Sequence, residues 1–286
     1  MLLKEEILWT EPVKSNPCCT EWKALADCDV FDDLKENVST NLFNLDVALH
    51  GGIAPEVYAL VGRNFDERHA LFIHLAEQFA QNDYHVIYLT CNDSPQSIMN
   101  KLLLRCDYKL YRNESSTVPF ILQQLESSPE KQSLFLKQLY RISQKIIVET
   151  QPSINLLELE ERISKLSEIS KVVLLLDDQQ FCPIELIDYE YYGNKLNSLR
   201  EIAQRFKVPI ISNVTLPKEE YWALKEGFPT KVGIENYADT IILFEKSQPA
   251  NTPYVLNIKI LSKTLYIKEQ FVSLTYHPLH CYFQDA

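Results

Sequence analysis

The segment GRNFDERH, residues 62–69, has the position of a phosphate-binding loop, between an apolar stretch at 57–61 and an amphipathic stretch. A loop of pattern GxxxxGK[ST] needs a second glycine for backbone access, a lysine for the terminal phosphate and a hydroxyl for Mg²⁺. Those three positions hold Glu67, Arg68 and His69. The position therefore predicts a phosphate site, whereas the residues at its decisive positions predict that phosphate binding is lost.

The physical effect of each replacement can be stated. Glu67 places a side chain and a negative charge where the backbone would approach an anion at the start of a helix. Arg68 keeps a positive charge without the compact ammonium of lysine. Glycine is also scarce, with 6 in 286 residues, about 2% against a typical ~7%. Arg63 and Arg68 form either a residual nucleotide site or a solvated loop paired with Asp66 and Glu67, and we favour the second interpretation.

A second group of acids follows the apolar run VVLLL at 172–176, which ends in Asp177 and Asp178. A continuous apolar run that ends in acid is typical of a central parallel strand, whose carboxyl edge carries the sites of α/β proteins. The two carboxylates either hold a metal or are strand-end acids bonded to a helix or water, and we favour the second interpretation. Other candidate ligands are Cys18, Cys19, Cys28, His277, His280 and Cys281. Their spacing matches no zinc finger, so we predict no metal site.

Composition restricts the class of protein. The chain has 286 residues, a net charge of −11 and 46% apolar residues, which suits a buried core and argues against indiscriminate attraction to nucleic acid. Seven cysteines without regular spacing indicate reduced thiols, and no signal peptide or membrane-spanning run is present. We predict a cytoplasmic protein with no membrane contact. Residues 1–38 are predicted as an extension or linker, and residues 39–286 as one domain.

From residue 57 onward, strand and helix patterns alternate, which predicts a parallel sheet covered by helices. The expected parallel strands are 57–61, 86–89, 145–149, 172–176, 208–212 and 240–244, with two edge strands at 255–260 and 270–276. The expected helices are 69–82, one that starts at Ser94-Pro95, 120–139 broken near Pro129, 154–169 and 196–206. The fold class is therefore α/β.

Five stretches in order carry a family resemblance: TNLFNLDVALHGGIAP, DSPQSIMNKLLL, IIVETQPSINLLELEERISKL, LREIAQRFKVPII and IENYADTIILF. From about Thr40 to Phe283, the chain resembles the C-terminal RecA-like motor domain of DnaB-type replicative helicases. The resemblance implies a RecA-like, P-loop-type fold with a mostly parallel central sheet and helices on both faces.

The resemblance also implies where functional residues would stand. It places Asn92 near the family's catalytic glutamate, Thr215 at its phosphate-sensing glutamine and Ser262 near the basic finger that reaches a neighbouring subunit's nucleotide. Asp177 matches the family's Mg²⁺-associated aspartate. Stabilisation of a phosphoryl-transfer transition state needs these groups together, so we expect no catalytic residues and no required cofactor.

The leading hypothesis is a catalytically inactive pseudo-ATPase that acts as a binding or assembly subunit. Its expected partners are further copies of itself, a DnaB-type helicase, or another component of a replication, plasmid or phage-related complex. A fold that is retained without its chemistry still offers its association surfaces. The expected partner contacts are Trp22, Tyr189, Tyr191 and Tyr192.

Two alternatives stay open. The first is a divergent ATPase that binds ATP and Mg²⁺ weakly through Arg68 and Asp177. The second is a single-stranded DNA-binding module, in which cations and aromatic rings contact the strand. Its contact residues would be Lys218, Trp222, Lys225 and Lys231, although Glu219, Glu220 and Glu226 dilute their charge.

Overall fold

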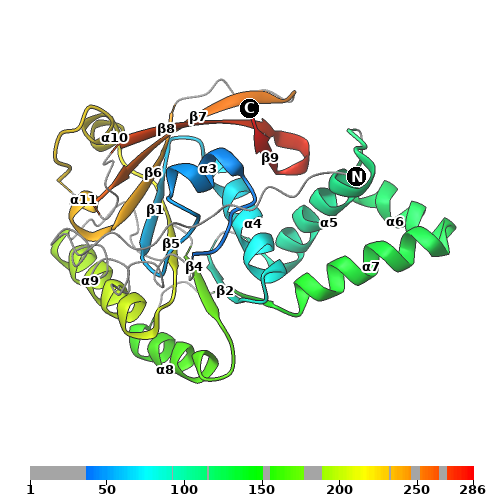
Figure 1. Cartoon of the computed structure of the whole chain (residues 1–286), viewed down its shortest axis with the longest axis horizontal. Helices are drawn as coiled ribbons and strands as arrows, with labels where there is room; N and C mark the ends of the chain where they lie inside the picture. Colours follow the sequence, from blue (N-terminus) through cyan, green and yellow to red (C-terminus); the bar gives the residue numbers. More distant parts are fainter. Residues whose placement is uncertain are drawn as a thin grey trace, which may run out of the picture. The chain divides into compact units, whose positions relative to one another are not determined.

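A sheet organises the computed structural model, which describes residues 37–91, 93–114, 116–150, 155–176, 189–231, 233–245, 252–263 and 269–286. The strands of these residues form one nine-stranded sheet in the order β3-β2-β4-β5-β1-β6-β7-β8-β9 (Figure 1). Residues 37–286 make one compact unit around this sheet.

Six parallel strands make up the first part of the sheet. They are β1 (Val57–Val61), β2 (His85–Thr90), β3 (Ile146–Thr150), β4 (Val172–Leu176), β5 (Ile210–Val214) and β6 (Thr240–Phe244). The apolar run at β4 lies between β2 and β5, as a strand buried on both faces should. The predicted parallel sheet is confirmed. The strand expected at 208–212 begins later because Pro209 has no N–H to donate to the ladder.

Three antiparallel strands complete the sheet: β7 (Tyr254–Ser262), β8 (Glu269–His277) and β9 (Tyr282–Asp285). The expectation of two edge strands was wrong, because β7 and β8 each have a neighbour on both sides. The edge is β9, a four-residue strand that follows the 3₁₀ turn η3 (Pro278–His280). So short a strand presents too little alternation to be recognised in the sequence.

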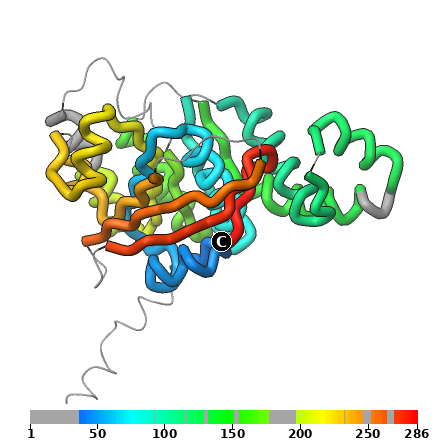
Figure 2. The backbone as a smooth tube through the Cα atoms, turned by 90° about the horizontal axis from the view of Figure 1, so that it is seen from above, coloured from blue at the N-terminus to red at the C-terminus, as the bar shows by residue number. Residues whose placement is uncertain are grey.

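Helices cover both faces of the sheet (Figure 1). Their bounds are α3 Phe43–Ala48, α4 Phe65–Gln81, α5 Pro95–Tyr111, α6 Val118–Ser127, α7 Pro129–Ser143, α8 Leu156–Ser167, α9 Tyr189–Phe206, α10 Lys218–Lys225 and α11 Ile234–Tyr237. One apolar core joins α3, α4 and α5 to the sheet, and the other joins α8, α9, α10 and α11 to its opposite face. Helices α5, α6 and α7 form the part that projects to one side in Figure 2.

Local signals explain where several helices start and end. Helix α5 begins after Ser94, whose hydroxyl accepts from the Ser97 N–H at 3.1 Å, with Pro95 at the first helical position. The helix expected at 154–169 is α8, which ends at Ser167, so Ile169 lies beyond it and is 78% exposed. Within the described residues, no helix has the length and apolar character needed to cross a membrane.

Candidate functional site

The candidate site lies where β1, β2 and β5 end and the following segments start. Parallel strands bring these carboxyl ends to one edge of the sheet, the usual location of a site in an α/β protein. The site includes the turn after β1, Asp93 after β2 and Thr215 after β5. Asn92, Asp177 and Asp178 lie outside the described residues, so their predicted roles stay predictions.

The turn between β1 and α4 is shorter than a phosphate-binding loop. Helix α4 begins at Phe65, so only Gly62, Arg63 and Asn64 separate it from the strand. The Asn64 side chain accepts from the Asp66 N–H at 3.0 Å and caps the helix. The helix start therefore has a side-chain acceptor and an acidic first turn in place of a bound anion. The helix predicted from His69 starts four residues earlier than expected, because Asn64 caps it.

Arg68 fills the interior of this turn. Its side chain is 1% exposed, and Nη2 donates to Thr215 Oγ1 at 2.7 Å. A Cβ added to Gly62 would lie 3.2 Å from Arg68 Cδ, which places the arginine stem against the backbone of the turn. The interpretation of Arg68 as a solvated loop residue was therefore wrong, because its guanidinium reaches across to the end of β5. Arg63, in contrast, is exposed.

Glu67 is also buried, at 1% exposure. Its carboxylate accepts a hydrogen bond from the Tyr254 hydroxyl at 2.5 Å. Tyr254 is the first residue of β7, so this contact joins the start of α4 to the antiparallel part of the sheet. The residue at the position of the loop's second glycine thus has an acceptor role inside the fold, and the solvated position expected for it was wrong.

A cluster of polar groups surrounds Asp93. His69 Nε2 lies 2.8 Å from Asp93 Oδ2 and 2.7 Å from Lys101 Nζ. Lys101 Nζ is 3.2 Å from the same carboxylate oxygen, and the Ser97 hydroxyl donates to Asp93 Oδ1 at 2.7 Å. Burial raises the pKa of Asp93, but the contacts with His69 outweigh it and hold that pKa well below its usual range. Asp93 is therefore an ionised carboxylate that is already bonded to protein groups.

Sequence reasoning missed Asp93, Ser97 and Lys101, although a signal was present. Ser97 and Lys101 are four apart in α5, so their side chains share one helix face, and Asp93 stands directly before the N-cap Ser94. What the sequence did not contain was the position of His69, which depends on where α4 starts.

The residues predicted to contact DNA lie on and after α10. Lys225 Nζ lies 5.4 Å from the centre of the Trp222 ring and 3.1 Å from Glu245 Oε1. The Glu220 carboxylate accepts from the Lys231 backbone N–H at 2.5 Å. Trp222 is 37% exposed, and Lys218 starts the helix with its side chain exposed. The structure thus joins Lys225 to Trp222, while an acid neutralises that lysine.

The predicted partner contacts are only partly described. Tyr189 is the first residue of α9, and Tyr191 and Tyr192 follow in the same helix. The side chains of these three tyrosines, and the whole of Trp22, lie outside the part of the chain that the structure describes. Three or more potential metal ligands do not come together anywhere in the part of the chain that the structure describes.

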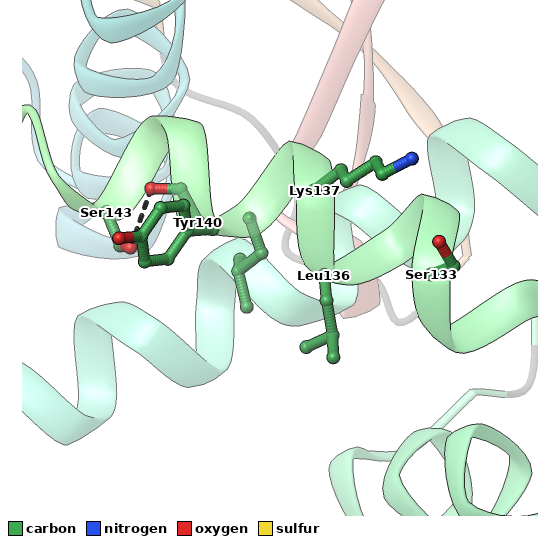
Figure 3. Close-up of a pocket in the computed structure, with 6 residues that line it drawn as sticks. Ser133, Leu136, Lys137, Tyr140 and Ser143 are labelled. Atoms are coloured by element: carbon green, nitrogen blue, oxygen red, sulfur yellow. Dashed lines mark hydrogen bonds between the residues drawn. The ribbon is translucent and has the colours of Figure 1, made fainter. Parts of the chain in front are cut away.

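A shallow groove of about 500 Å³ runs along α7. Its lining residues are Ser133, Leu136, Lys137, Leu139, Tyr140 and Ser143. Figure 3 shows Leu136 and Tyr140 on this helix, and they are 46% and 66% exposed. The buried residues Phe135 and Ile142 lie on the opposite side of α7. The helix therefore has one apolar side in the core and another that is available to a partner.

Comparison with solved structures gives many matches, and two of them cover almost all of this chain. One, described as an "ATPase Domain", has a TM-score of 0.66 and 14% sequence identity, and the match covers 94% of this chain and 97% of that one. "The Structure Of A DnaB-Like Replicative Helicase And Its Interactions With Primase" has a TM-score of 0.66 and 12% identity, and the match covers 96% of this chain and 68% of that one. No protein-family model matches the sequence. Comparison with curated proteins also gave no match.

These similarities establish the fold. The chain has the α/β fold, with a mostly parallel sheet, of DnaB-like helicase ATPase domains, as the sequence resemblance predicts. At such low identity, the activity of those proteins does not transfer with the fold.

Proposed function

We propose that this chain is a catalytically inactive, DnaB-like pseudo-ATPase that acts as a binding or assembly subunit. The observation that carries the proposal is the contact of the buried Arg68, at the position of the loop lysine, with Thr215 at the end of β5. A nucleotide phosphate would need the space beside this side chain and the backbone N–H groups at the start of α4.

Two further contacts support the proposal. Glu67, at the position of a loop glycine, is held by Tyr254, and His69, at the position of the Mg²⁺ hydroxyl, lies between Asp93 and Lys101. To bind Mg-ATP in the usual geometry, the protein would have to break these contacts and expose buried charges. Each such step has a free-energy cost of about 1–3 kcal/mol. The divergent-ATPase alternative would have to overcome these costs first.

An assembly role is supported by large apolar side chains that a partner could cover. The groove along α7 exposes Leu136 and Tyr140, and residues 1–38 contain Trp22 and other large apolar side chains. Each such side chain contributes roughly 1.5–3 kcal/mol when it is fully buried. The partners that we propose are further copies of this chain, a DnaB-type helicase, or another replication, plasmid or phage-related component.

Two solution measurements test this function. Thermal unfolding with and without Mg-ATP should give the same midpoint, because a ligand raises stability only if it binds the folded state. Light scattering of the chain, alone and mixed with a DnaB-type helicase, should give a mass above the monomer or a complex, without a nucleotide requirement. A monomer that joins no complex and is stabilised by Mg-ATP would contradict the proposal.

A further inference from the structure

Three of the chain's 6 histidines gather around the C-terminal turn. His74 lies on α4, His277 ends β8 and His280 lies in η3. Their exposures are 2%, 7% and 3%. Histidine is the side chain whose charge changes most readily near neutral pH, so a buried group of histidines makes the contacts around it sensitive to acid.

His277 and His280 hold the C-terminal turn against α5 through Tyr108. The Tyr108 ring stacks on His280, with centroids 4.5 Å apart and planes at 15°. The Tyr108 hydroxyl lies 3.2 Å from His277 Nδ1, and Tyr282 of β9 packs against the same ring at 5.0 Å. One tyrosine thus contacts residues before, within and after the turn.

In each imidazole, one ring nitrogen has no hydrogen-bond acceptor for a second proton. His277 Nε2 and His280 Nδ1 are buried, and neither has a hydrogen-bond partner among the described residues. His280 Nε2 lies 3.3 Å from the Glu114 carbonyl oxygen. Protonation would therefore create a buried N–H without an acceptor and add a charge. The charged groups that face this cluster are Arg105 and Asp107 of α5, and Arg112 and Glu114 just after that helix.

The electrostatic surroundings agree with this geometry. Burial lowers the pKa of His277, with further lowering by His280 and Arg112 against a raising effect of Glu114. Burial also lowers the pKa of His280, although Glu114 and Asp107 oppose it. Both groups bind fewer protons in the closed fold than in water. Their contribution to stability is therefore present above the ordinary histidine pKa of about 6.5 and is lost as the pH falls below it.

We propose that residues 277–285 form an acid-sensitive latch. Neutral His277 and His280 contact Tyr108 and hold the latch closed, and protonation of these histidines releases the turn and β9. Release would uncover the edge of β8 at residues 274–277, which pair with β9 in the closed state. A freed strand edge presents unpaired N–H and C=O groups that can pair with another chain.

Other contacts make the latch open as a unit. Phe283 of β9 is buried and stacks on Tyr276, with ring centroids 4.7 Å apart. The Asp285 carboxylate accepts from the backbone N–H groups of Phe43 and Asn44 at 2.9 and 2.8 Å. These contacts do not involve His277 or His280, so they keep the strand in place at neutral pH and set the cost of opening.

Hydrogen exchange of the full chain, corrected for the intrinsic pH dependence, tests the latch. Each histidine that is neutral when closed and has an ordinary pKa when open favours opening about 30-fold at pH 5. Exchange in peptides that cover 277–285 should therefore rise at least about 30-fold between pH 8 and pH 5, while β4 stays protected. The variant His277→Gln/His280→Gln should lose most of this rise. The matched control His50→Gln, at an exposed histidine, should behave like the parent chain.

A second measurement keeps the test decisive if the double variant fails to fold. In the parent chain, nuclear magnetic resonance of the imidazole groups should show His277 and His280 neutral at about pH 6.5, where a free histidine is half protonated. The latch is excluded if both imidazoles titrate near the ordinary histidine pKa of about 6.5, if exchange at 277–285 rises no more than elsewhere, or if a folded double variant keeps the full acid response.

Discussion

Arg68 on α4 donates a hydrogen bond to Thr215, the residue after β5, at 2.7 Å. The two residues are far apart in the sequence, yet they meet because β5 lies next to β1 in the sheet. The phosphate-loop position and the phosphate-sensing position implied by the family resemblance are thus joined by the protein's own side chains. A buried guanidinium held in this way acts as part of the fold.

The first prediction concerns Arg68→Ala. The substitution removes a buried donor and leaves a cavity against Gly62, so we expect the free energy of unfolding to fall by about 1–3 kcal/mol. Urea unfolding followed by circular dichroism measures the change. Arg63→Ala is the matched control, because Arg63 is exposed on the same turn and its loss should change stability little. Equal effects of the two substitutions would show that Arg68 is not a structural residue.

The second prediction concerns repair of the loop sequence. The triple variant Glu67→Gly, Arg68→Lys, His69→Thr should gain weak nucleotide binding, seen as a small rise of the unfolding midpoint with Mg-ATP. It should not gain turnover, because the groups near Asn92 and Ser262 remain unsuitable and these parts act together. Steady phosphate release that disappears on adding Asp177→Ala would contradict this prediction.

Much of the fold followed from the sequence because its signals are local. The strands at 172–176 and 240–244 are continuous apolar runs, and the bounds of β4 and β6 agree with them. The start of α5 was readable from Ser94 and Pro95, which act within one helical turn. The strand β9 was missed because its pairing with β8 depends on a turn that periodicity does not describe.

The candidate site was less predictable because its contacts join distant segments. The sequence predicted that Glu67 and Arg68 do not suit a phosphate loop, but not that Tyr254 and Thr215 would hold them. Those partners depend on the order of strands in the sheet. A solvated loop with paired charges was therefore the simplest expectation, whereas Glu67 and Arg68 are buried and hydrogen-bonded to distant residues.

The third prediction uses the buried cluster around Glu77, which joins α4 to α5. Glu77 contacts Arg105 and Lys109, each at 2.8 Å. Burial raises the pKa of Glu77, but the charges of Arg105 and Lys109 outweigh it and hold the pKa at about 2. Since the pKa in the folded state is depressed, the cluster stabilises the fold above the ordinary glutamate pKa of about 4.3 and loses this effect as the pH falls toward 2.

Glu77→Gln should therefore lower the free energy of unfolding at pH 7 by about 3–5 kcal/mol, because it leaves Arg105 buried without its carboxylate. The loss of stability on acidification from pH 5 to pH 3 should also become smaller in this variant. The control Glu161→Gln removes an exposed pair with Lys165, so it should change stability little. An unchanged acid response in a folded Glu77→Gln chain would rule out the role assigned to this cluster.

The last prediction concerns how the protein associates. Deleting residues 1–35 should leave a folded core, because the described residues 37–286 form their own compact unit and Val38 already pairs with Ile53. The deletion should remove association, because it takes away Trp9, Trp22 and Phe31, whose apolar area would stabilise a contact with a partner. Light scattering measures the mass of the assembly, and circular dichroism confirms folding.

Trp22→Ser in the full chain tests the same surface with a single change. Its matched control is Trp222→Ser, at the partly exposed tryptophan on α10. We expect Trp22→Ser to weaken association at least tenfold and Trp222→Ser to leave it unchanged. If the truncated chain forms assemblies with the same number of copies and keeps its copurifying proteins, the association surface lies elsewhere. The exposed side of α7, with Leu136 and Tyr140, then becomes the next surface to mutate.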